Sequence, residues 1–202
     1  IHSFLAHPLS LSAFKEYPME IAEVASMSME LFTMNHWQAF FDNTHDLNRA
    51  QEHQLERTIT IFPWIAIIDK FQHWVYENPN HSIEERTQAW TTIAKEFSTN
   101  SIDYSGLDQY RAIGWQRQLH LFEVPFYYIE YGIAQLGAIG MWMQYQKNPT
   151  LALENYMNAL SLGGTKTLPE LYQTAGISFD FSPSYVKTLM DFTRDELEKL
   201  YQ

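Results

Sequence analysis

The stretch YPMEIAEVASMSMELF, residues 17–32, places three carboxylates in a segment that is otherwise almost wholly apolar. At about 100° per residue, Glu20, Glu23 and Glu30 fall on one face of a helix. Apolar and small side chains cover the other faces, and this pattern predicts a buried helix. Buried carboxylates need a cation, a hydrogen-bond network or a metal. The alternative is a solvated acidic stripe on an amphipathic helix, which is the commoner arrangement for three acids at this spacing.

Helical periodicity continues through the rest of the chain, and no segment shows a convincing strand pattern. Pro63 is expected to kink the helix over residues 46–77 without ending it, and Pro125 to interrupt the helix over residues 115–146 locally. Ser82 and Glu85 have the spacing of a capping box. The sequence therefore predicts an all-α fold, with helices over about residues 18–41, 46–77, 82–97, 115–146, 150–162, 168–175 and 183–201.

Composition excludes several classes of protein. The net charge of −11, from 13 basic and 24 acidic residues, disfavours a surface for nucleic acids or anionic membranes. The chain has no cysteine, which excludes disulfides and thiolate chemistry. No apolar run reaches the roughly 18 residues of a membrane span, and the beginning lacks the layout of a signal peptide. We therefore expect a soluble, cytoplasmic protein that binds neither nucleic acid nor membranes.

A second candidate region is HLFEVPFYYIEYGIAQLGAIG, residues 120–140. His120, Tyr127, Tyr128 and Tyr131 are close together in it, and Tyr128 and Tyr131 share a helix face because they are three residues apart. Tyrosine hydroxyls beside an imidazole are neutral hydrogen-bond donors, which suit the stabilisation of a developing oxyanion. The alternative is that these rings are aromatic packing in a core, and the pattern alone does not decide between the two.

Three blocks of sequence carry a resemblance to a known family. In order they are IHSFLAH…YPMEIAEVASMSMEL, HLFEVPFYYIEYGIAQLGA and LSLGGTKTLPELYQTAGI. Together they resemble the C-terminal part of the oligoendopeptidase F and thimet-oligopeptidase-like family of zinc metallopeptidases, over nearly the whole chain. The resemblance implies that residues 1–202 form the C-terminal, helical part of a zincin-like catalytic domain. The complete enzyme is then expected to hydrolyse short peptides with one zinc ion per active site.

The resemblance also assigns roles near the metal. In this family an H-E-x-G-H helix supplies two zinc-binding histidines and the general-base glutamate, and a second helix supplies a third ligand that Glu23 matches. Glu20 and His2 are then expected beside the zinc ligands, not on the metal. The opening letters IHS match the end of the longer motif H-E-x-G-H-A-x-H-S. This match implies that the chain begins just past the two histidine ligands and by itself holds no catalytic zinc and is inactive.

On the substrate side, His120, Tyr128 and Tyr131 match the family's residues that contact the transition state. Tyr127 is assigned to substrate binding. The implied partners are short peptides and the remaining N-terminal part of the same enzyme.

Two further hypotheses stay open. The chain would be a non-catalytic helical binding module if its acids are solvated and its tyrosines are core residues. It would be one half of a split active site if a separate N-terminal piece completes it. An H-E-x-G-H sequence encoded directly before Ile1 would favour the peptidase over the binding module.

Overall fold

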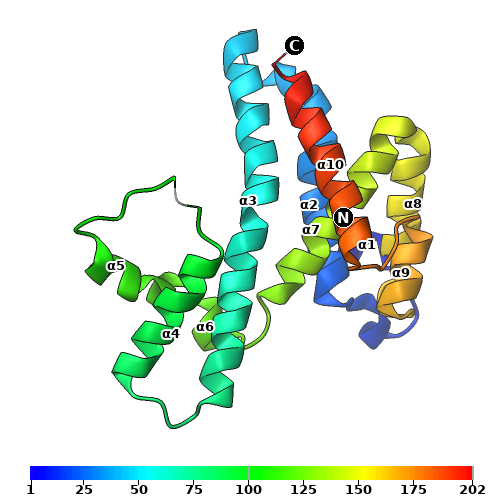
Figure 1. Ribbon diagram of the computed structural model, residues 1–202. Coiled ribbons are helices and arrows are strands. Elements are labelled where there is room, and N and C mark those ends of the chain that lie inside the picture. The colour runs from blue at the N-terminus through cyan, green and yellow to red at the C-terminus, as the bar shows by residue number, and fades with distance from the viewer. Residues whose placement is uncertain (100, 202) are drawn as a thin grey trace. The chain divides into compact units, whose positions relative to one another are not determined.

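The computed structural model describes residues 1–99 and 101–201. In this part of the chain every regular element is a helix and none is a strand, which confirms the predicted all-α fold (Figure 1). The chain divides into two compact units, Ile1–Ile59 with Ile133–Gln202 (unit 1) and Thr60–Gly132 (unit 2). Helices α3 (Thr44–Glu77) and α7 (Ile129–Lys147) each run from one unit into the other. None of the described helices is long and apolar enough to cross a bilayer.

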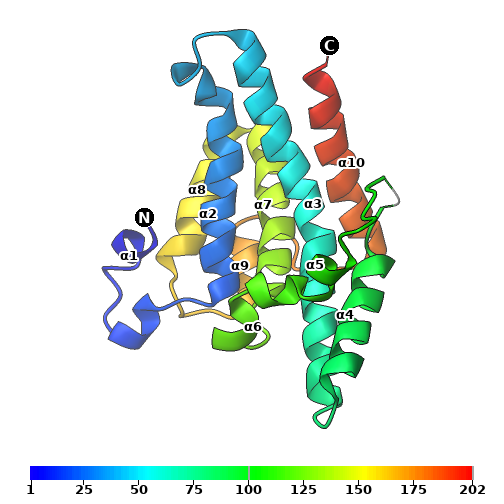
Figure 2. The same ribbon diagram turned by 90° about the vertical axis from the view of Figure 1, so that its left-hand side faces the viewer.

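Unit 1 is a packed group of helices around an apolar core. Helix α2 contacts α8 and α9, and α1 contacts α8 (Figure 2). The Tyr156 hydroxyl of α8 donates a hydrogen bond to the Ala25 carbonyl of α2 at 3.0 Å. In addition to parts of α3 and α7, the unit contains α1 (His2–Leu5), η1 (Ser12–Lys15), α2 (Met19–Thr33), η2 (Met34–Ala39), α8 (Pro149–Ser161), α9 (Leu168–Thr174) and α10 (Pro183–Lys199).

A glycine lets α2, α7 and α9 approach closely in unit 1. A Cβ atom at Gly137 of α7 would lie 2.8 Å from Val24 Cγ2 and 2.9 Å from Tyr172 Oη. Both neighbours are buried, and Tyr172 donates its hydroxyl proton to the Ile133 carbonyl at 3.2 Å. The helix that carries Glu23 is therefore held against α7 by contacts that leave no room for a side chain at Gly137.

The Gly163-Gly164 pair ties the opening segment to the end of α8. The Gly164 amide donates to the Phe14 carbonyl at 2.8 Å. A Cβ atom at Gly164 would lie 2.4 Å from the Glu16 carbonyl oxygen, and Gly163 has φ of +51°. Only glycine fits this close approach of two backbones.

Unit 2 has its own core, formed where α3 and α4 (Ile83–Glu96) pack with the short helices α5 (Asp108–Ala112), η3 (Gly114–Arg117) and α6 (His120–Glu123). Trp90 of α4 lies 5.1 Å from the Phe71 ring and donates its indole proton to the Arg111 carbonyl at 2.7 Å. The buried members of this core are Ile65, Ile67, Ile68, Phe71, Trp90, Ile93 and Tyr128. The predicted capping box of Ser82 and Glu85 is confirmed at the start of α4.

Two of the predicted helices are shorter in the structure. The helix expected from residue 18 to about 41 ends at Thr33 and continues as the 3₁₀ helix η2. The Thr33 hydroxyl donates to the Met29 carbonyl at 2.8 Å and accepts from the Trp37 indole at 3.3 Å. Hydrogen bonds from threonine back to the preceding turn compete with regular helix geometry.

The helix expected over residues 115–146 begins only at Ile129. Pro125 lacks an amide proton and disfavours helical geometry at the residue before it. Phe126 then takes a positive φ of 61°, which no helix accommodates. By contrast, Pro63 lies inside α3 without ending it. The other predicted helices match the structure to within a few residues.

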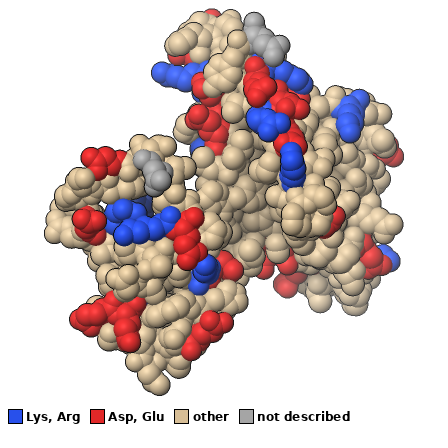
Figure 3. All heavy atoms as spheres, in the orientation of Figure 1, with Lys and Arg blue, Asp and Glu red and all other residues tan. Residues whose placement is uncertain are grey.

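Charges of both signs alternate along α10, as Figure 3 shows. Asp191 pairs with Lys187 at 2.5 Å and with Arg194 at 3.1 Å. Such exposed pairs contribute little to stability, typically about 0–1 kcal/mol each. The exposed side of α10 is therefore a solvated surface of mixed charge, with three basic and four acidic side chains along the helix.

Candidate functional site

Four aromatic rings meet in unit 2, at the point where α6 gives way to α7. His120 begins α6, and its Nε2 lies 3.0 Å from the Tyr131 hydroxyl. The His120 ring is 5.1 Å from the Tyr128 ring and 5.5 Å from the Tyr131 ring, both nearly edge-on. Tyr127 stacks on His120 at 6.0 Å and meets Tyr131 at 5.4 Å. The structure therefore brings together all four residues that the sequence singled out in this region.

A strained turn makes this meeting possible. Phe126 has φ of +61°, and the Tyr127 amide donates to the Val124 carbonyl at 3.2 Å. The left-handed conformation costs a non-glycine residue about 1–2 kcal/mol. The Phe126 ring offsets this cost by packing 5.0 Å from the His73 ring and 4.9 Å from the Tyr76 ring. Sequence reasoning missed Phe126, although Pro125 beside it marks the turn.

Two further residues, Trp64 and Gln118, form hydrogen bonds with the ring cluster. The indole N–H of Trp64 lies 3.0 Å from the Tyr128 hydroxyl and 3.2 Å from Gln118 Oε1. Gln118 Nε2 in turn lies 2.7 Å from His120 Nδ1. Trp64 and Gln118 are 54 residues apart, so no local pattern in the sequence could have paired them. Neither residue was predicted as part of the site.

The Tyr128 hydroxyl is a neutral group in this environment. Tyr128 is only 8% exposed, and burial raises the pKa of its hydroxyl, while the hydrogen bond from Trp64 works in the opposite direction. Its ring belongs to the core of unit 2, as the packing alternative expected. Packing and hydrogen bonding therefore coexist at this residue.

Glu23 lies in unit 1, on the half-buried side of α2, and Glu20 is half-buried as well. Glu30 is exposed and accepts a hydrogen bond from Gln54 at 3.0 Å. The fully buried face of the helix consists of Ile21, Val24, Ala25, Ser28, Leu31 and Phe32. The prediction of a buried helix is thus right for one face. The acids lie outside that face, Glu20 and Glu23 at half-buried positions and Glu30 at an exposed one, where water lowers the free-energy cost of their charge.

His2 is within electrostatic range of Glu23. Burial lowers the pKa of the His2 imidazole, and the charge of the Glu23 carboxylate works in the opposite direction. The His2 ring also packs 4.8 Å from the Tyr17 ring.

These acids and histidines do not form a complete metal site. Across residues 1–99 and 101–201, no group of three or more His, Cys, Asp or Glu side chains is placed to hold a metal ion. A catalytic zinc normally has three protein ligands. The residues present therefore do not fit a zinc ion by themselves, and Glu23 is a single carboxylate that could serve as one ligand of a larger set.

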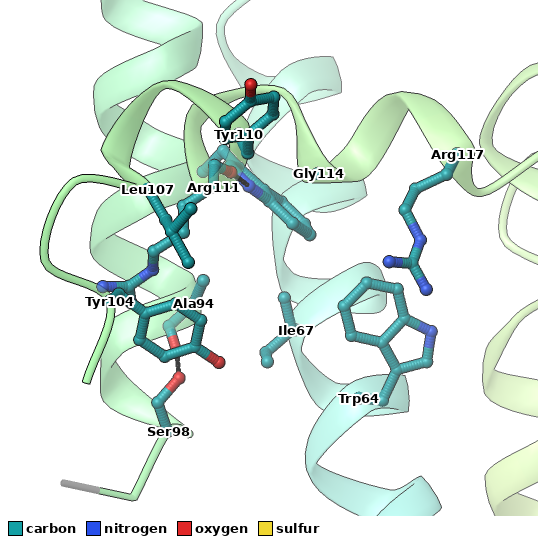
Figure 4. A pocket seen from close by; sticks show the side chains of 11 residues that line it. Trp64, Ile67, Ala94, Ser98, Tyr104, Leu107, Tyr110, Arg111, Gly114 and Arg117 are labelled. Carbon is teal, nitrogen blue, oxygen red and sulfur yellow. Dashed lines mark hydrogen bonds between the residues drawn. The ribbon is translucent and has the colours of Figure 1, made fainter. Parts of the chain in front are cut away.

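A cavity of about 350 Å³ lies in unit 2 beside the indole of Trp64 (Figure 4). Arg117 and Trp64 border one side of it, and Tyr104 and Arg111 border another. The Arg111 guanidinium is 4.0 Å from the centre of the Tyr104 ring, a cation–π contact. The lining residues are Trp64, Ile67, Trp90, Ala94, Ser98, Tyr104, Leu107, Tyr110, Arg111, Gly114 and Arg117. Aromatic walls and two arginines make the cavity apolar with a positive edge.

Known proteins resemble this chain in both sequence and structure. PZ peptidase A, solved with an inhibitor, is 32% identical with a TM-score of 0.90. A structure named oligoendopeptidase F is 30% identical with a TM-score of 0.85, and another, from Bacillus anthracis, is 29% identical with a TM-score of 0.79. Each match covers 98% of this chain but only 35%, 34% and 32% of the matched chains. The chain thus spans about a third of their length.

No curated protein matches the chain. The sequence model of peptidase family M3 matches residues 1–191. This match and the structural similarity agree with the resemblance seen in the three sequence blocks. The chain therefore belongs to peptidase family M3.

Proposed function

We propose that this chain supplies part of the active site of a zinc-dependent oligopeptidase that hydrolyses short peptides. Membership of family M3, whose members are zinc peptidases, supports the reaction class. The observation that carries the assignment of residues is the cluster of one imidazole and three phenol rings around His120. Such a cluster is rich in neutral hydrogen-bond donors.

Neutral donors suit the chemistry of peptide hydrolysis. Attack on the peptide carbonyl converts its oxygen into an oxyanion, and donors held in place stabilise this charge without reorganising. In the proposal, Tyr128 and Tyr131 donate to the oxyanion or to the adjacent peptide backbone, and His120 supports them through its hydrogen bond to the Tyr131 hydroxyl. Tyr127 contacts the substrate chain beside them.

The acids of α2 have a separate role in the proposal. Glu23 serves as one ligand of the catalytic zinc, and Glu20 and His2 orient it or balance its charge, as groups next to metal ligands commonly do. The other ligands and the general base are not among these residues, because the 202-residue sequence contains no H-E-x-G-H. The 202 residues alone are therefore proposed to be inactive, and the activity belongs to a protein that carries both parts.

The test uses the enzyme that contains this chain together with an H-E-x-G-H helix. Tyr131→Phe and Tyr128→Phe are each measured for kcat, KM and zinc content on a short peptide. Loss of one oxyanion donor is expected to lower kcat about 100- to 1,000-fold, equivalent to roughly 2.7–4 kcal/mol, with KM and zinc content nearly unchanged. His120→Ala is expected to lower turnover without releasing the metal.

Two variants serve as comparisons. Tyr76→Phe removes a hydroxyl from an exposed tyrosine of unit 2 and should keep wild-type kcat. Tyr127→Phe should affect KM more than kcat. If Tyr128→Phe, Tyr131→Phe and His120→Ala all retain wild-type kcat, the roles assigned to these residues are wrong.

A further inference from the structure

The indole of Trp64 decides which way the Gln118 amide faces. An indole nitrogen can only donate a hydrogen bond, so the Gln118 atom 3.2 Å from Trp64 Nε1 must be the acceptor Oε1. The opposite orientation would set the amide NH₂ group against the indole N–H, with two donors facing each other. Gln118 is half-buried, so it cannot turn freely to water.

The orientation of Gln118 then decides the tautomer of His120. The amide nitrogen of Gln118 faces His120 Nδ1 at 2.7 Å, and an amide nitrogen donates. Nδ1 is therefore the acceptor, and a neutral imidazole with an unprotonated Nδ1 carries its proton on Nε2. That N–H points at the Tyr131 hydroxyl, 3.0 Å away.

The tautomer in turn directs the tyrosine hydroxyls. The Tyr131 oxygen accepts from His120, so its own proton points away from the imidazole. The Tyr128 oxygen accepts from Trp64 at 3.0 Å, so its proton points away from the indole. A hydroxyl that accepts a hydrogen bond becomes a stronger donor, because chains of hydrogen bonds polarise one another.

We propose that Gln118 and Trp64 are positioning residues, which hold His120 in the Nε2–H tautomer and thereby direct the hydroxyl proton of Tyr131 away from the imidazole and that of Tyr128 away from the indole. One donor, the Trp64 indole, sets the direction of its hydrogen bonds to Gln118 and Tyr128, and through Gln118 the direction of those made by His120. The effect of these hydroxyl orientations on catalysis rests on the proposed function. The tautomer itself follows from the geometry of unit 2 alone.

The direct test is nuclear magnetic resonance of the His120 ring nitrogens in the ¹⁵N-labelled 202-residue chain. The spectra are recorded at about pH 9, where an ordinary imidazole is neutral, and a His120→Asn variant identifies the signals. The expected result is an unprotonated, pyridine-type Nδ1 and a protonated, pyrrole-type Nε2. A ring protonated on Nδ1 in the wild-type chain would overturn the proposal.

Gln118→Glu keeps nearly the same side-chain shape and should reverse the tautomer of His120. A carboxylate has no proton to donate, so it accepts from Trp64 with one oxygen and requires a proton on His120 Nδ1 for the other. Nδ1 should change from pyridine-type to pyrrole-type. Gln116→Glu adds the same charge at an exposed position of η3 and should leave both nitrogens unchanged. An unchanged ring in Gln118→Glu would also overturn the proposal.

A kinetic arm links the tautomer to turnover in the complete enzyme. Assayed at about pH 9, as for the spectra, Gln118→Glu should lower kcat on the order of 10- to 1,000-fold at nearly constant KM, because a neutral ring protonated on Nδ1 accepts the Tyr131 proton at Nε2 and so withdraws it from substrate. In a background of Tyr131→Phe, the same change should have little further effect, since it acts through that hydroxyl.

The spectra and the kinetics together distinguish a failure of the proposed function from a failure of the positioning role. If the tautomer reverses as expected but Tyr131→Phe and Gln118→Glu both keep wild-type kcat, the proposed function fails and the positioning of His120 stands. If Tyr131→Phe lowers kcat but the wild-type ring is protonated on Nδ1, the proposed function stands and the positioning role fails.

Discussion

Replacing Gly137 by alanine tests the packing that holds the Glu23 helix in place. The new methyl group would lie 2.8 Å from Val24 Cγ2 and 2.9 Å from Tyr172 Oη, closer than normal van der Waals contact. Neither neighbour can move easily, because Val24 is 2% and Tyr172 1% exposed. Overpacking of this kind costs typically 1–3 kcal/mol. The gain in helix propensity from glycine to alanine, about 0.8–1 kcal/mol, partly offsets that cost.

A comparison with Gly140→Ala in the same helix cancels the gain in helix propensity, because both variants replace glycine by alanine in α7. A Cβ atom at Gly140 would lie 3.2 Å from Ile177 Cγ2 and 3.3 Å from Tyr185 Oη, so smaller adjustments accommodate it. Gly137→Ala is therefore expected to be about 1–3 kcal/mol less stable than Gly140→Ala. For a chain of this size the difference corresponds to a Tm lower by roughly 2–12 °C. Thermal unfolding followed by circular dichroism, with urea titration as a second probe, measures both variants.

A second substitution identifies the neighbour that clashes. Val24→Ala removes the Cγ2 atom nearest the new methyl group, so the double variant should be more stable than the sum of the two single changes predicts, by about 0.5 kcal/mol or more. Equal stability of Gly137→Ala and Gly140→Ala within about 0.5 kcal/mol would refute the close packing of α2 on α7 and with it the fixed position of Glu23.

Two further predictions concern metal binding and pH. The 202-residue chain should retain little zinc after dialysis, because Glu23 alone cannot replace a set of three ligands; stoichiometric zinc lost in a Glu23→Gln variant would contradict this. Hydrogen bonds from the Ser82 backbone and hydroxyl lower the pKa of Glu85 below its ordinary 4.5. The stability from this cap should therefore be present above about pH 4.5 and be lost as pH falls through the lowered value. Urea midpoints between pH 3 and 7 should show a smaller acid loss for Glu85→Gln than for wild type, with Glu84→Gln as the control, and identical acid losses in Glu85→Gln and wild type would contradict the prediction.

Features that depend on neighbouring residues could be predicted from the sequence. The capping box of Ser82 and Glu85 needs only a serine and a glutamate at the correct spacing, and the structure has both of its hydrogen bonds. The all-α class follows from repeated helical periodicity, and the family follows from three separate blocks of similarity that the family match confirms.

Features that depend on tertiary contacts could not be predicted. The start of α7 at Ile129 depends on Phe126 taking a left-handed conformation, which its packing against His73 and Tyr76 offsets. The support of the ring cluster by Trp64 and Gln118 joins residues distant in the chain. Helical periodicity reports which face is apolar, but it does not report which distant side chain donates a hydrogen bond to that face.

The zinc content of the complete enzyme with Glu23→Gln tests the central claim most directly. The wild-type enzyme, with its H-E-x-G-H helix present, should hold one zinc ion per chain. Glu23→Gln should lose most of this metal after dialysis, because an uncharged amide is a poor ligand in place of a carboxylate. Glu30→Gln, a change in the same helix at an exposed acid that accepts from Gln54, should keep it. Full zinc occupancy in Glu23→Gln would contradict the assignment of Glu23 to the metal.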